Sequence, residues 1–386
     1  MLWTFLVCLA GCSRAVRQTG PETDVYPDGS PPPPTAAELA AQRVAELACA
    51  RITIAATGDV MLGTDFPKNH LPDDDAFSFI ADLTPVLTSA DIAFGNLEGV
   101  LMDGGEPVKK CKDPNACYLF RSPTRYAERL AAAGYDIMSL ANNHARDFGE
   151  EGRTSSMQAL EAAGIKHSGR AGDIATWPNG EVKVALIAFA PFKESNPMLD
   201  LDEAMALVQM LTEKYNLVIV SMHGGGEGTD AARVPFTTEY YLGEDRGDVV
   251  KFSHHMIDAG ADLVVGHGPH VPRAMEIYSN RLIAYSLGNF ATYYGISVGG
   301  EKALAPVLVA TLDGNGRFIS GEIVSAIQIR PDGPLLDTRD RAYERIWELT
   351  EQDFSGGEIK FQNGGVFFPL SDAPSQCPQT TIAPKF

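Results

Sequence analysis

The 386-residue sequence has too little positive charge for a protein that binds nucleic acid. It carries 31 Lys and Arg against 50 Asp and Glu, a formal net charge of −19, which disfavours any polyanion partner held by long-range attraction. Low-complexity composition is absent too. With 45% hydrophobic and 9% aromatic residues, the sequence excludes a disordered chain and allows a large buried core.

The N-terminus lacks an apolar run long enough to cross a membrane. Only residues 2–10 are almost wholly apolar, whereas a bilayer span needs roughly 20 residues. No Lys or Arg precedes the run, and Leu9-Ala10-Gly11-Cys12 closes it. This end resembles the lipobox of bacterial lipoproteins, which implies a signal peptide over residues 1–12, with cleavage before Cys12 and acylation of that cysteine. An ordinary secretory signal is the alternative.

We therefore expect an exported protein, lipid-anchored to the bacterial cell envelope on its periplasmic or outer surface. Residues 13–34 are rich in Pro, Gly, Asp and Ser, which predicts an extended linker. Thr35 stands three residues before Glu38, the spacing of a helix capping box. An apolar stripe of Leu39, Val44 and Leu47 follows, so the folded body is expected to begin near residue 35.

The chain contains no Cys-x-x-Cys, which disfavours a zinc site built from thiolates. Cys8 and Cys12 belong to the signal region, so four cysteines remain for the folded protein, and an oxidising compartment favours two disulfides. Cys111 and Cys117 bracket a short loop and are expected to pair. Cys49 with Cys377 would then join the first helix to the tail.

Apolar runs alternate with amphipathic segments along most of the chain, which predicts a layered α/β domain. The apolar runs are 52–56, 92–94, 137–140, 182–189, 217–221, 263–265 and 282–285, and the predicted helices cover 123–133, 153–163, 202–214 and 249–259. After Ala303 the pattern changes to hairpins, which favours a second sheet. We expect one domain over residues 35–330, with a C-terminal helix and tail over 331–386 that pack on it.

Polar side chains follow five of the apolar runs. They are Asp59, Asn96 with Glu98, Asn142 to His144, His223 with Glu227, and His267 with His270. Because the carboxyl ends of neighbouring strands face one crevice in an open α/β sheet, these five loops are expected to converge. Carboxylate, amide and imidazole groups together suit a divalent cation such as Mn, Zn or Fe. Each residue alone has a structural explanation, as a turn former, a helix cap or a core histidine.

The same segments resemble the motifs of the CapA family of poly-γ-glutamate capsule synthesis proteins, within the calcineurin-like metallophosphatase superfamily. The similarity runs from about residue 52 to 295, and its motifs are Gly58–Gly63, Gly95–Glu98, Ala141–Gly149, His223–Glu227, Gly266–His270 and Tyr285–Phe290. It implies a four-layer α/β/β/α metallophosphatase-like sandwich whose metal centre lies between loops at one end.

The resemblance also implies a role for each site residue. The metal ligands would be Asp59, Glu98, Asn143, His223, His267 and His270, holding one or two ions. His144 would donate a proton to the leaving group, and Glu227 would bind metal or orient a metal-activated water. Asn96, Asn142 and Asp147 would support these groups. The first motif has Met61 where classical metallophosphatases have histidine, so the number of metals and the activity stay open.

Two functions of different classes follow from this reading. The first is an exported metal-dependent hydrolase that acts on a phosphoester or amide of an envelope polymer. The second is a non-catalytic, metal-containing scaffold or polymer-binding factor of a capsule export complex. An anionic polymer or its precursor is the expected partner in both cases. The local basic cluster could receive it, or could be an ordinary solvated face; its members are Lys109, Lys110, Lys112, Arg121, Arg125 and Arg129.

Overall fold

The computed structural model describes residues 33–109, 117–179, 182–370 and 377. Two units are distinguished, of which the second, Val44–Phe386, contains both sheets and the site discussed below. Predicted features at Cys12, Cys111, Lys110 and Lys112 lie outside the described residues.

Helix α1 (Ala36–Cys49) starts where its sequence predicts. The backbone N–H of Glu38 donates to Oγ1 of Thr35 at 3.2 Å, and the Glu38 carboxylate accepts from the Thr35 backbone at 2.7 Å, which is the predicted capping box. The predicted apolar stripe is wrong, because Leu39 and Val44 are each 51% exposed. Burial begins only at Leu47, whose carbonyl accepts a hydrogen bond from Gly314.

The first sheet is built around strand β1 (Ile52–Met61), which has partners along both edges. β1 pairs parallel with β2 and antiparallel with β17, and β16 pairs with its C-terminal end. In spatial order the strands of this sheet are β21 (Ile359–Phe361), β22 (Val366–Pro369), β18 (Phe318–Val324), β17 (Val307–Leu312), β1, β2 (Ile92–Leu97), β5 (Ile137–Ser139) and β6 (Lys166–Ser168). β16 (Asn289–Thr292) lies beside β1.

The second sheet centres on three parallel strands, β8, β10 and β13. In spatial order it contains β14 (Met275–Tyr278), β15 (Arg281–Ala284), β13 (Leu263–His267), β10 (Leu217–His223), β8 (Val182–Ala190) and β7 (Ala175–Asn179), with β9 (Asn196–Pro197) beside β8. The central strands are apolar on both faces, as expected for strands covered on both sides.

The two sheets pack face to face, and alternate residues of each strand point to opposite faces. From β1, Ile54 points into the core between the sheets, where it joins Leu186 of β8 and Ile219 of β10. Ala55, the next residue of β1, points to the outer face, which helices cover. The inter-sheet core therefore contains side chains from both sheets.

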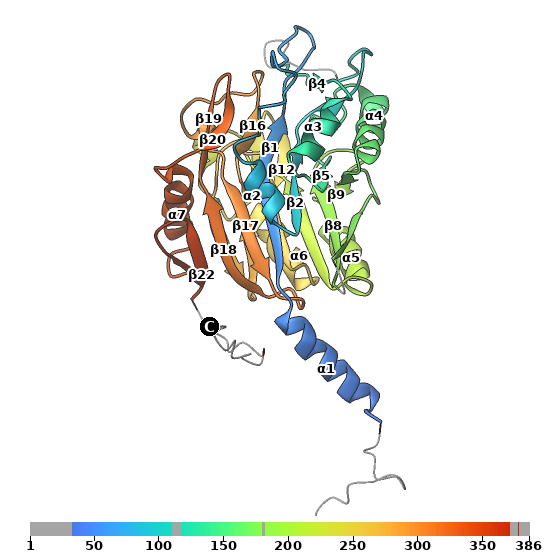
Figure 1. The fold of residues 1–386 in the computed structure, drawn as a ribbon, viewed down its shortest axis with the longest axis vertical. Helices are drawn as coiled ribbons and strands as arrows, with labels where there is room; N and C mark the ends of the chain where they lie inside the picture. Colours follow the sequence, from blue (N-terminus) through green and yellow to red (C-terminus); the bar gives the residue numbers. More distant parts are fainter. Residues whose placement is uncertain (1–32, 110–116, 180–181, 371–376, 378–386) are drawn as a thin grey trace, which may run out of the picture. The chain divides into compact units, whose positions relative to one another are not determined.

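Helices cover the outer face of each sheet and complete the predicted α/β/β/α sandwich (Figure 1). Those on the first sheet are α2 (Thr84–Ser89), α3 (Tyr126–Ala132) and α4 (Gly149–Ala162), and those on the second are α5 (Leu201–Thr212) and α6 (Val249–Asp258). The Asp200 and Asp248 side chains cap α5 and α6 by accepting hydrogen bonds from backbone N–H groups. Four predicted helices are thus present, with boundaries shifted by a few residues.

The C-terminal region corrects two predictions. The hairpin after Ala303 does not start a second sheet, because β17 pairs with β1 and so extends the first. The final helix was expected over residues 335–352. It begins later, as α7 (Arg341–Asp353), because residues Gly333–Leu336 form strand β20 against β19 (Ala326–Ile329). The tail packs on the body as expected, since β22 pairs with β18.

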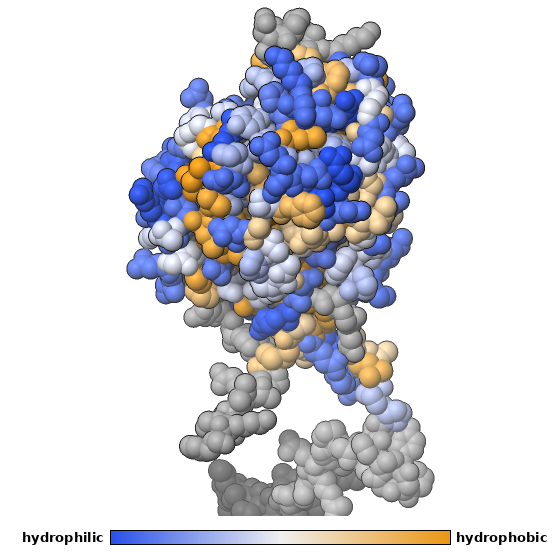
Figure 2. Space-filling model, turned by 45° about the horizontal axis from the view of Figure 1, so that its top comes forward, coloured by the Kyte–Doolittle hydropathy of each residue, from blue (hydrophilic) through white to orange (hydrophobic). Residues whose placement is uncertain are grey.

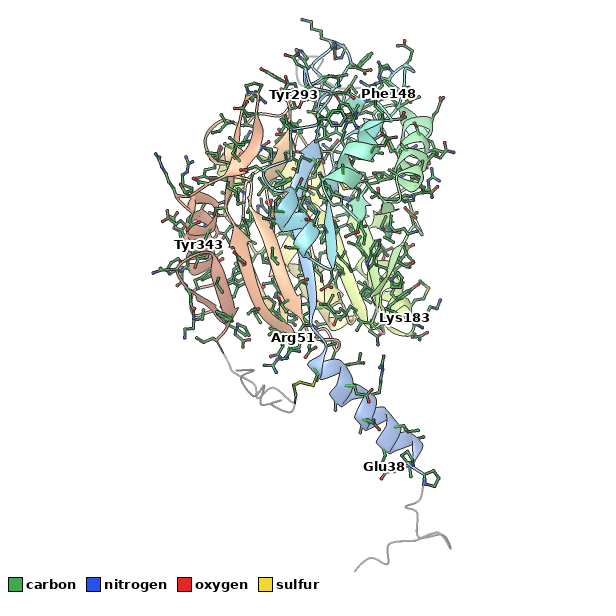
Figure 3. The ribbon with its side chains drawn as sticks, viewed as in Figure 1. Glu38, Arg51, Phe148, Lys183, Tyr293 and Tyr343 are labelled. Atoms are coloured by element: carbon green, nitrogen blue, oxygen red, sulfur yellow. A yellow bond between two sulfur atoms is a disulfide. The ribbon has the colours of Figure 1, made fainter. Side chains whose placement is uncertain are left out.

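Cys49 and Cys377 form a disulfide (Figure 3), and Cys117 is also disulfide-bonded, although its predicted partner lies outside the described residues. Within the described ranges no helix has both the length and the apolar composition of a membrane span. On the face drawn in Figure 2, hydrophobic residues lie in separate patches among hydrophilic ones.

Candidate metal centre

The predicted site residues come from both sheets rather than from one. β1, β2 and β5 of the first sheet lead to Asp59, Glu98 and Asn143, whereas β10 and β13 of the second lead to His223 and His267. β10 and β13 are neighbours, and their register places His223 opposite His267. The five polar segments therefore meet at one end of the sandwich, as the strand order requires.

Two glycines let strands approach closely beside this cluster. A Cβ on Gly58 would lie 2.0 Å from the carbonyl oxygen of Gly288, and that oxygen accepts a hydrogen bond from the Asp59 backbone. Likewise a Cβ on Gly266 would lie 2.1 Å from the carbonyl oxygen of Tyr285. No side chain fits at either position, so both glycines set the position of the residue that follows.

Asp59, Glu98 and His223 form the centre of the site. Each is buried, and one ligand atom from each lies within 4.8 Å of the others. His270 joins them, with Nδ1 2.8 Å from Oδ2 of Asp59 and 3.0 Å from Oδ1 of Asn289. His270 has a positive φ of 60°, which places its ring back over β1.

The charges in this cluster are strongly coupled. Burial alone would raise the pKa of Asp59, but hydrogen bonding and attraction from His270 outweigh it and hold that pKa below its ordinary value. Burial, with repulsion from Asp59, raises the pKa of Glu98 to about 8. Burial opposes protonation of His270, yet the Asp59 carboxylate raises the pKa of His270 to about 9. Glu98 therefore lacks the positive charge nearby that keeps Asp59 ionised.

The two histidines of the second sheet suit a metal ligand role. Burial lowers the pKa of His267 to about 4 and that of His223 well below its ordinary value, so both rings are neutral and have lone pairs available. Among the described residues, neither nitrogen of His223 or His267 has a hydrogen-bond partner, and neither do Glu98 Oε1 and Asn143 Oδ1. Buried polar atoms are rarely left without partners, so this donor set fits a divalent cation.

A chain of amide hydrogen bonds supports the cluster from the first sheet. The Asn96 amide donates to Asp59 Oδ1 at 2.8 Å and to Glu98 Oε2 at 2.6 Å. The Asn142 amide donates to Asn96 Oδ1 at 2.9 Å, and Asn142 Oδ1 accepts from the backbone of His144 at 3.0 Å. The two carboxylates are thus oriented by the same chain that fixes His144.

His144 is held by a buried carboxylate. Its Nδ1 lies 2.8 Å from Asp147 Oδ2, which also accepts from the backbone of Phe120. Lys109 Nζ lies 3.0 Å from the other Asp147 oxygen. Burial and the charge of Lys109 outweigh the attraction of Asp147 and lower the pKa of His144. Among the described residues Nε2 has no partner, so it remains available to a ligand.

Glu227 lies beside the cluster and is paired with arginine. Its Oε1 is 2.9 Å from Nη1 of Arg246, and its Oε2 is 3.8 Å from Nε2 of His270. Arg246 is almost fully buried, between the rings of Phe192 and Tyr241 at 5.1 and 5.3 Å. No sequence motif marks Arg246.

A buried ion pair fixes the loop that carries Glu227. Arg273 donates to both carboxylate oxygens of Glu239, at 2.9 and 2.7 Å, and Glu239 accepts from the backbone of Gly226 at 2.9 Å. Arg273 also donates to the carbonyl oxygens of Gly226 and Ala231. Because Arg273 follows His270 closely in the chain, the pair joins the His270 loop to the Glu227 loop.

Replacing Arg273 with alanine is expected to lower the free energy of unfolding by about 3–5 kcal/mol, because it leaves the Glu239 carboxylate buried without its partner. Urea denaturation measures the change. Lys183→Ala, at an exposed position, is the control and should change stability by less than about 0.5 kcal/mol. An Arg273→Ala variant as stable as the control would contradict this assignment.

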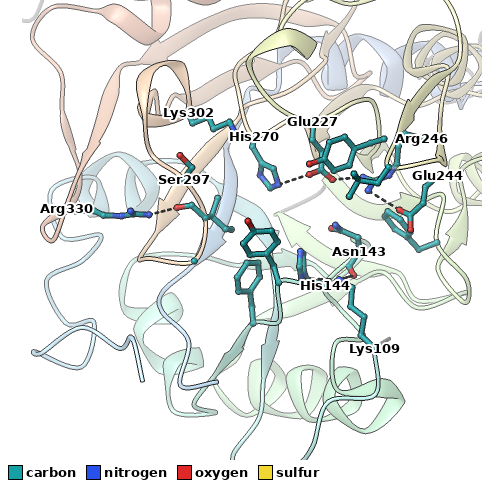
Figure 4. Close-up of a pocket in the computed structure, with 17 residues that line it drawn as sticks. Lys109, Asn143, His144, Glu227, Glu244, Arg246, His270, Ser297, Lys302 and Arg330 are labelled. Atoms are coloured by element: carbon teal, nitrogen blue, oxygen red, sulfur yellow. Dashed lines mark hydrogen bonds and ion pairs between the residues drawn. The ribbon is translucent and has the colours of Figure 1, made fainter. Parts of the chain in front are cut away.

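The cluster opens into a cavity of about 820 Å³ (Figure 4). The predicted residues Asn143, His144, Glu227 and His270 line it, together with residues the sequence did not indicate: Tyr118, Phe120, Phe192, Tyr241, Leu242, Glu244, Arg246, Gly295, Ile296, Ser297, Lys302 and Arg330. Most of these come from loops without a motif, so no local pattern could have identified them.

The described members of the predicted basic cluster have different surroundings. Of its described members, Lys109 lines the cavity. Arg121 pairs with Asp65, and the carboxylate of Asp75 binds both Arg125 and Arg129. These three arginines are neutralised by nearby acidic groups, which favours the alternative of an ordinary solvated face for them.

Residues 53–294 match the family described as bacterial capsule synthesis protein PGA_cap. The chain is 26% identical over 332 residues to the capsule biosynthesis protein CapA of Bacillus anthracis, covering 80% of this chain and 75% of that protein. It is 25% identical over 336 residues to the PGA biosynthesis protein CapA of Bacillus subtilis, covering 81% of each.

Among solved structures, the chain is similar to the NAD nucleotidase of Haemophilus influenzae, with a TM-score of 0.41 and 10% identity. The matched region covers 78% of this chain and 63% of the nucleotidase chain. This chain therefore spans less than two thirds of that enzyme's length.

Proposed function

Because the chain belongs to the bacterial capsule synthesis family PGA_cap, we propose that it serves the synthesis of an anionic envelope polymer, poly-γ-glutamate or a related one. The names of two relatives, which refer to capsule and PGA biosynthesis, support this polymer class. Within that process we propose that the protein is a metal-dependent hydrolase of an amide or phosphoester bond, and that it works with other proteins of a capsule synthesis complex.

The observation that carries the proposal is the convergence of Asp59, Glu98 and His223 beside unpartnered buried nitrogen and oxygen atoms. We propose that these three residues hold a divalent cation with Asn143, His267 and His270, and that Mn, Zn or Fe is the metal. A cation bound there would supply Lewis-acid catalysis at the scissile group.

His144 is the group proposed to move a proton. Its Nδ1–H donates to Asp147, so this contact fixes the ring orientation and leaves Nε2 directed to a ligand. In amide hydrolysis, water adds across the C–N bond and the leaving nitrogen needs a proton, which the protonated Nε2 of His144 would supply. A lowered pKa means that His144 must first accept that proton, and it can do so from the attacking water.

One observation favours the second candidate function, a non-catalytic polymer-binding factor. Glu227, the expected base, is 2.9 Å from the Arg246 guanidinium. The ion pair occupies Oε1 of Glu227, so only Oε2 is left to orient a water. A protein that only binds polymer needs such a pair for structure and needs no base.

Incubation of the purified protein with γ-linked glutamate oligomers and Mn²⁺ tests the two functions. A hydrolase shortens the oligomers, which chromatography detects, and EDTA stops the reaction. Parallel incubation with p-nitrophenyl phosphate tests phosphoester hydrolysis. Binding of the oligomers with no cleavage of either compound would favour the binding factor, and neither binding nor cleavage would contradict the proposed function.

We also propose that Cys12 anchors the protein in the cell envelope through an attached lipid. Cys12→Ser is expected to abolish fatty-acid labelling and release the protein from the membrane fraction, because one thioether attachment point is removed. Cys8→Ser is the matched control, since Cys8 lies within the expected signal peptide and is lost on cleavage. Undiminished labelling of Cys12→Ser would contradict the anchor.

A further inference from the structure

The cations that line the cavity fall into two groups on opposite sides (Figure 4). On one side Arg246 forms ion pairs with Glu227 and Glu244, at 2.9 and 3.1 Å. Lys109, near His144, pairs with Asp147 at 3.0 Å. The charges of these two cations are therefore neutralised by the protein itself.

Lys302 and Arg330 occupy the other side, with Ser297 between them in the view of Figure 4. Neither forms an ion pair with any carboxylate of the described residues. Of the four cations that line the cavity, only these two lack a carboxylate partner among the described residues. Their charge is left for a ligand that enters the cavity.

Both residues are held in place. Arg330 donates to the carbonyl oxygen of Ile296, and its guanidinium carbon lies 4.8 Å from the centre of the Tyr294 ring. The carbonyl oxygen of Lys302 accepts from the Asn289 amide at 3.1 Å, and Asn289 Oδ1 lies 3.0 Å from Nδ1 of His270. The Lys302 backbone is therefore connected through one side chain to the proposed metal cluster.

We propose that Lys302 and Arg330 form a carboxylate-binding subsite that holds the γ-linked glutamate chain beside the metal cluster. This inference rests on the proposed function. A guanidinium and an ammonium group provide charge-assisted hydrogen bonds to free carboxylates, which a γ-linked chain presents at every residue. A cavity of about 820 Å³ admits a short segment of such a chain. Lys302, Arg330 and His144 line the same cavity, so carboxylates held at the subsite determine which segment reaches His144.

The test measures binding of a γ-glutamate oligomer of defined length to the full chain in saturating Mn²⁺ by isothermal titration calorimetry. The variant is Lys302→Gln/Arg330→Gln, and the control is Lys183→Gln/Lys360→Gln, which removes the same charge at exposed positions that do not line the cavity. Lys183 lies at the end of the body opposite Tyr293 (Figure 3).

We expect the Kd of the cavity variant to rise about tenfold for each cation removed, and its salt dependence to weaken. The control should bind like the wild-type protein. If the wild-type protein binds and both double variants bind equally well, the subsite is wrong while the proposed function stands. If the wild-type protein binds no oligomer, both fail. The single variant Lys302→Gln, with the melting temperature of each protein, separates lost binding from lost folding.

Discussion

Replacement of His223 with alanine is expected to abolish stoichiometric binding of Mn, Zn or Fe. His223 is buried, neutral and without a hydrogen-bond partner among the described residues, and it completes the group formed with Asp59 and Glu98. Elemental analysis of protein purified without chelator measures the loss. His255→Ala is the matched control, because the His255 ring is partly exposed and its Nδ1 lies 2.7 Å from the carbonyl oxygen of Lys251 in α6.

Metal should also stabilise the fold. A cation that binds only the native state, at a free concentration of 100 times its Kd, adds about 2.7 kcal/mol to the free energy of unfolding. Wild-type protein and His255→Ala should therefore melt at a higher temperature with added Mn or Zn, and His223→Ala should not respond. Wild-type protein that contains no metal and gains no stability from either ion would contradict the assignment of the metal site.

His144→Ala is expected to reduce turnover of the polymer by about 10²–10⁴-fold while metal content stays normal, because the change removes the proton-transfer group and leaves the proposed ligands in place. Asp147→Asn should lose part of the same activity, since the carboxamide no longer fixes the ring through Nδ1. Initial rates with γ-glutamate oligomers and metal analysis of each variant measure the two effects.

His255→Ala, measured in the same assay, should keep wild-type rates. Undiminished turnover by His144→Ala would remove this residue from the mechanism. His144 would then only line the cavity, and another group would have to supply the proton to the leaving nitrogen.

The sequence predicted the strands well and their grouping less well. The apolar runs at 182–189 and 217–221 became β8 and β10 within two residues, because buried parallel strands are almost wholly apolar. Because the strands of both sheets are apolar, their sequences do not indicate which sheet each strand joins. Strands of both sheets are covered on both faces, so nothing local separates β1 from β8.

Asp59 illustrates a second limit. The apolar run was expected to end before Gly58, yet β1 continues to Met61 and contains Asp59. The pairing of β1 with β2 shifts between Ala56 and Asp59, which marks an irregular step in the ladder. A polar residue inside an irregular strand has the same local pattern as a polar residue in a loop.

The site residues with motifs could be predicted, and the cavity wall could not. Asp59, Glu98 and His223 each follow a strong strand signal, so the topology alone brings them together. Lys302 and Arg330 stand in segments without such a signal. They reach the cavity because β17 returns to pair with β1, a contact between distant parts of the chain that local patterns do not encode.

The pairing of β1 with β17 also constrains when the protein can fold. Ile52 is opposite Leu312, so the first sheet cannot be completed until a ribosome has translated nearly the whole chain. Such long-range pairing slows folding, and β1 would remain exposed meanwhile. The delay would suit the export that the proposed lipid anchor requires, because a secretion channel admits an unfolded chain.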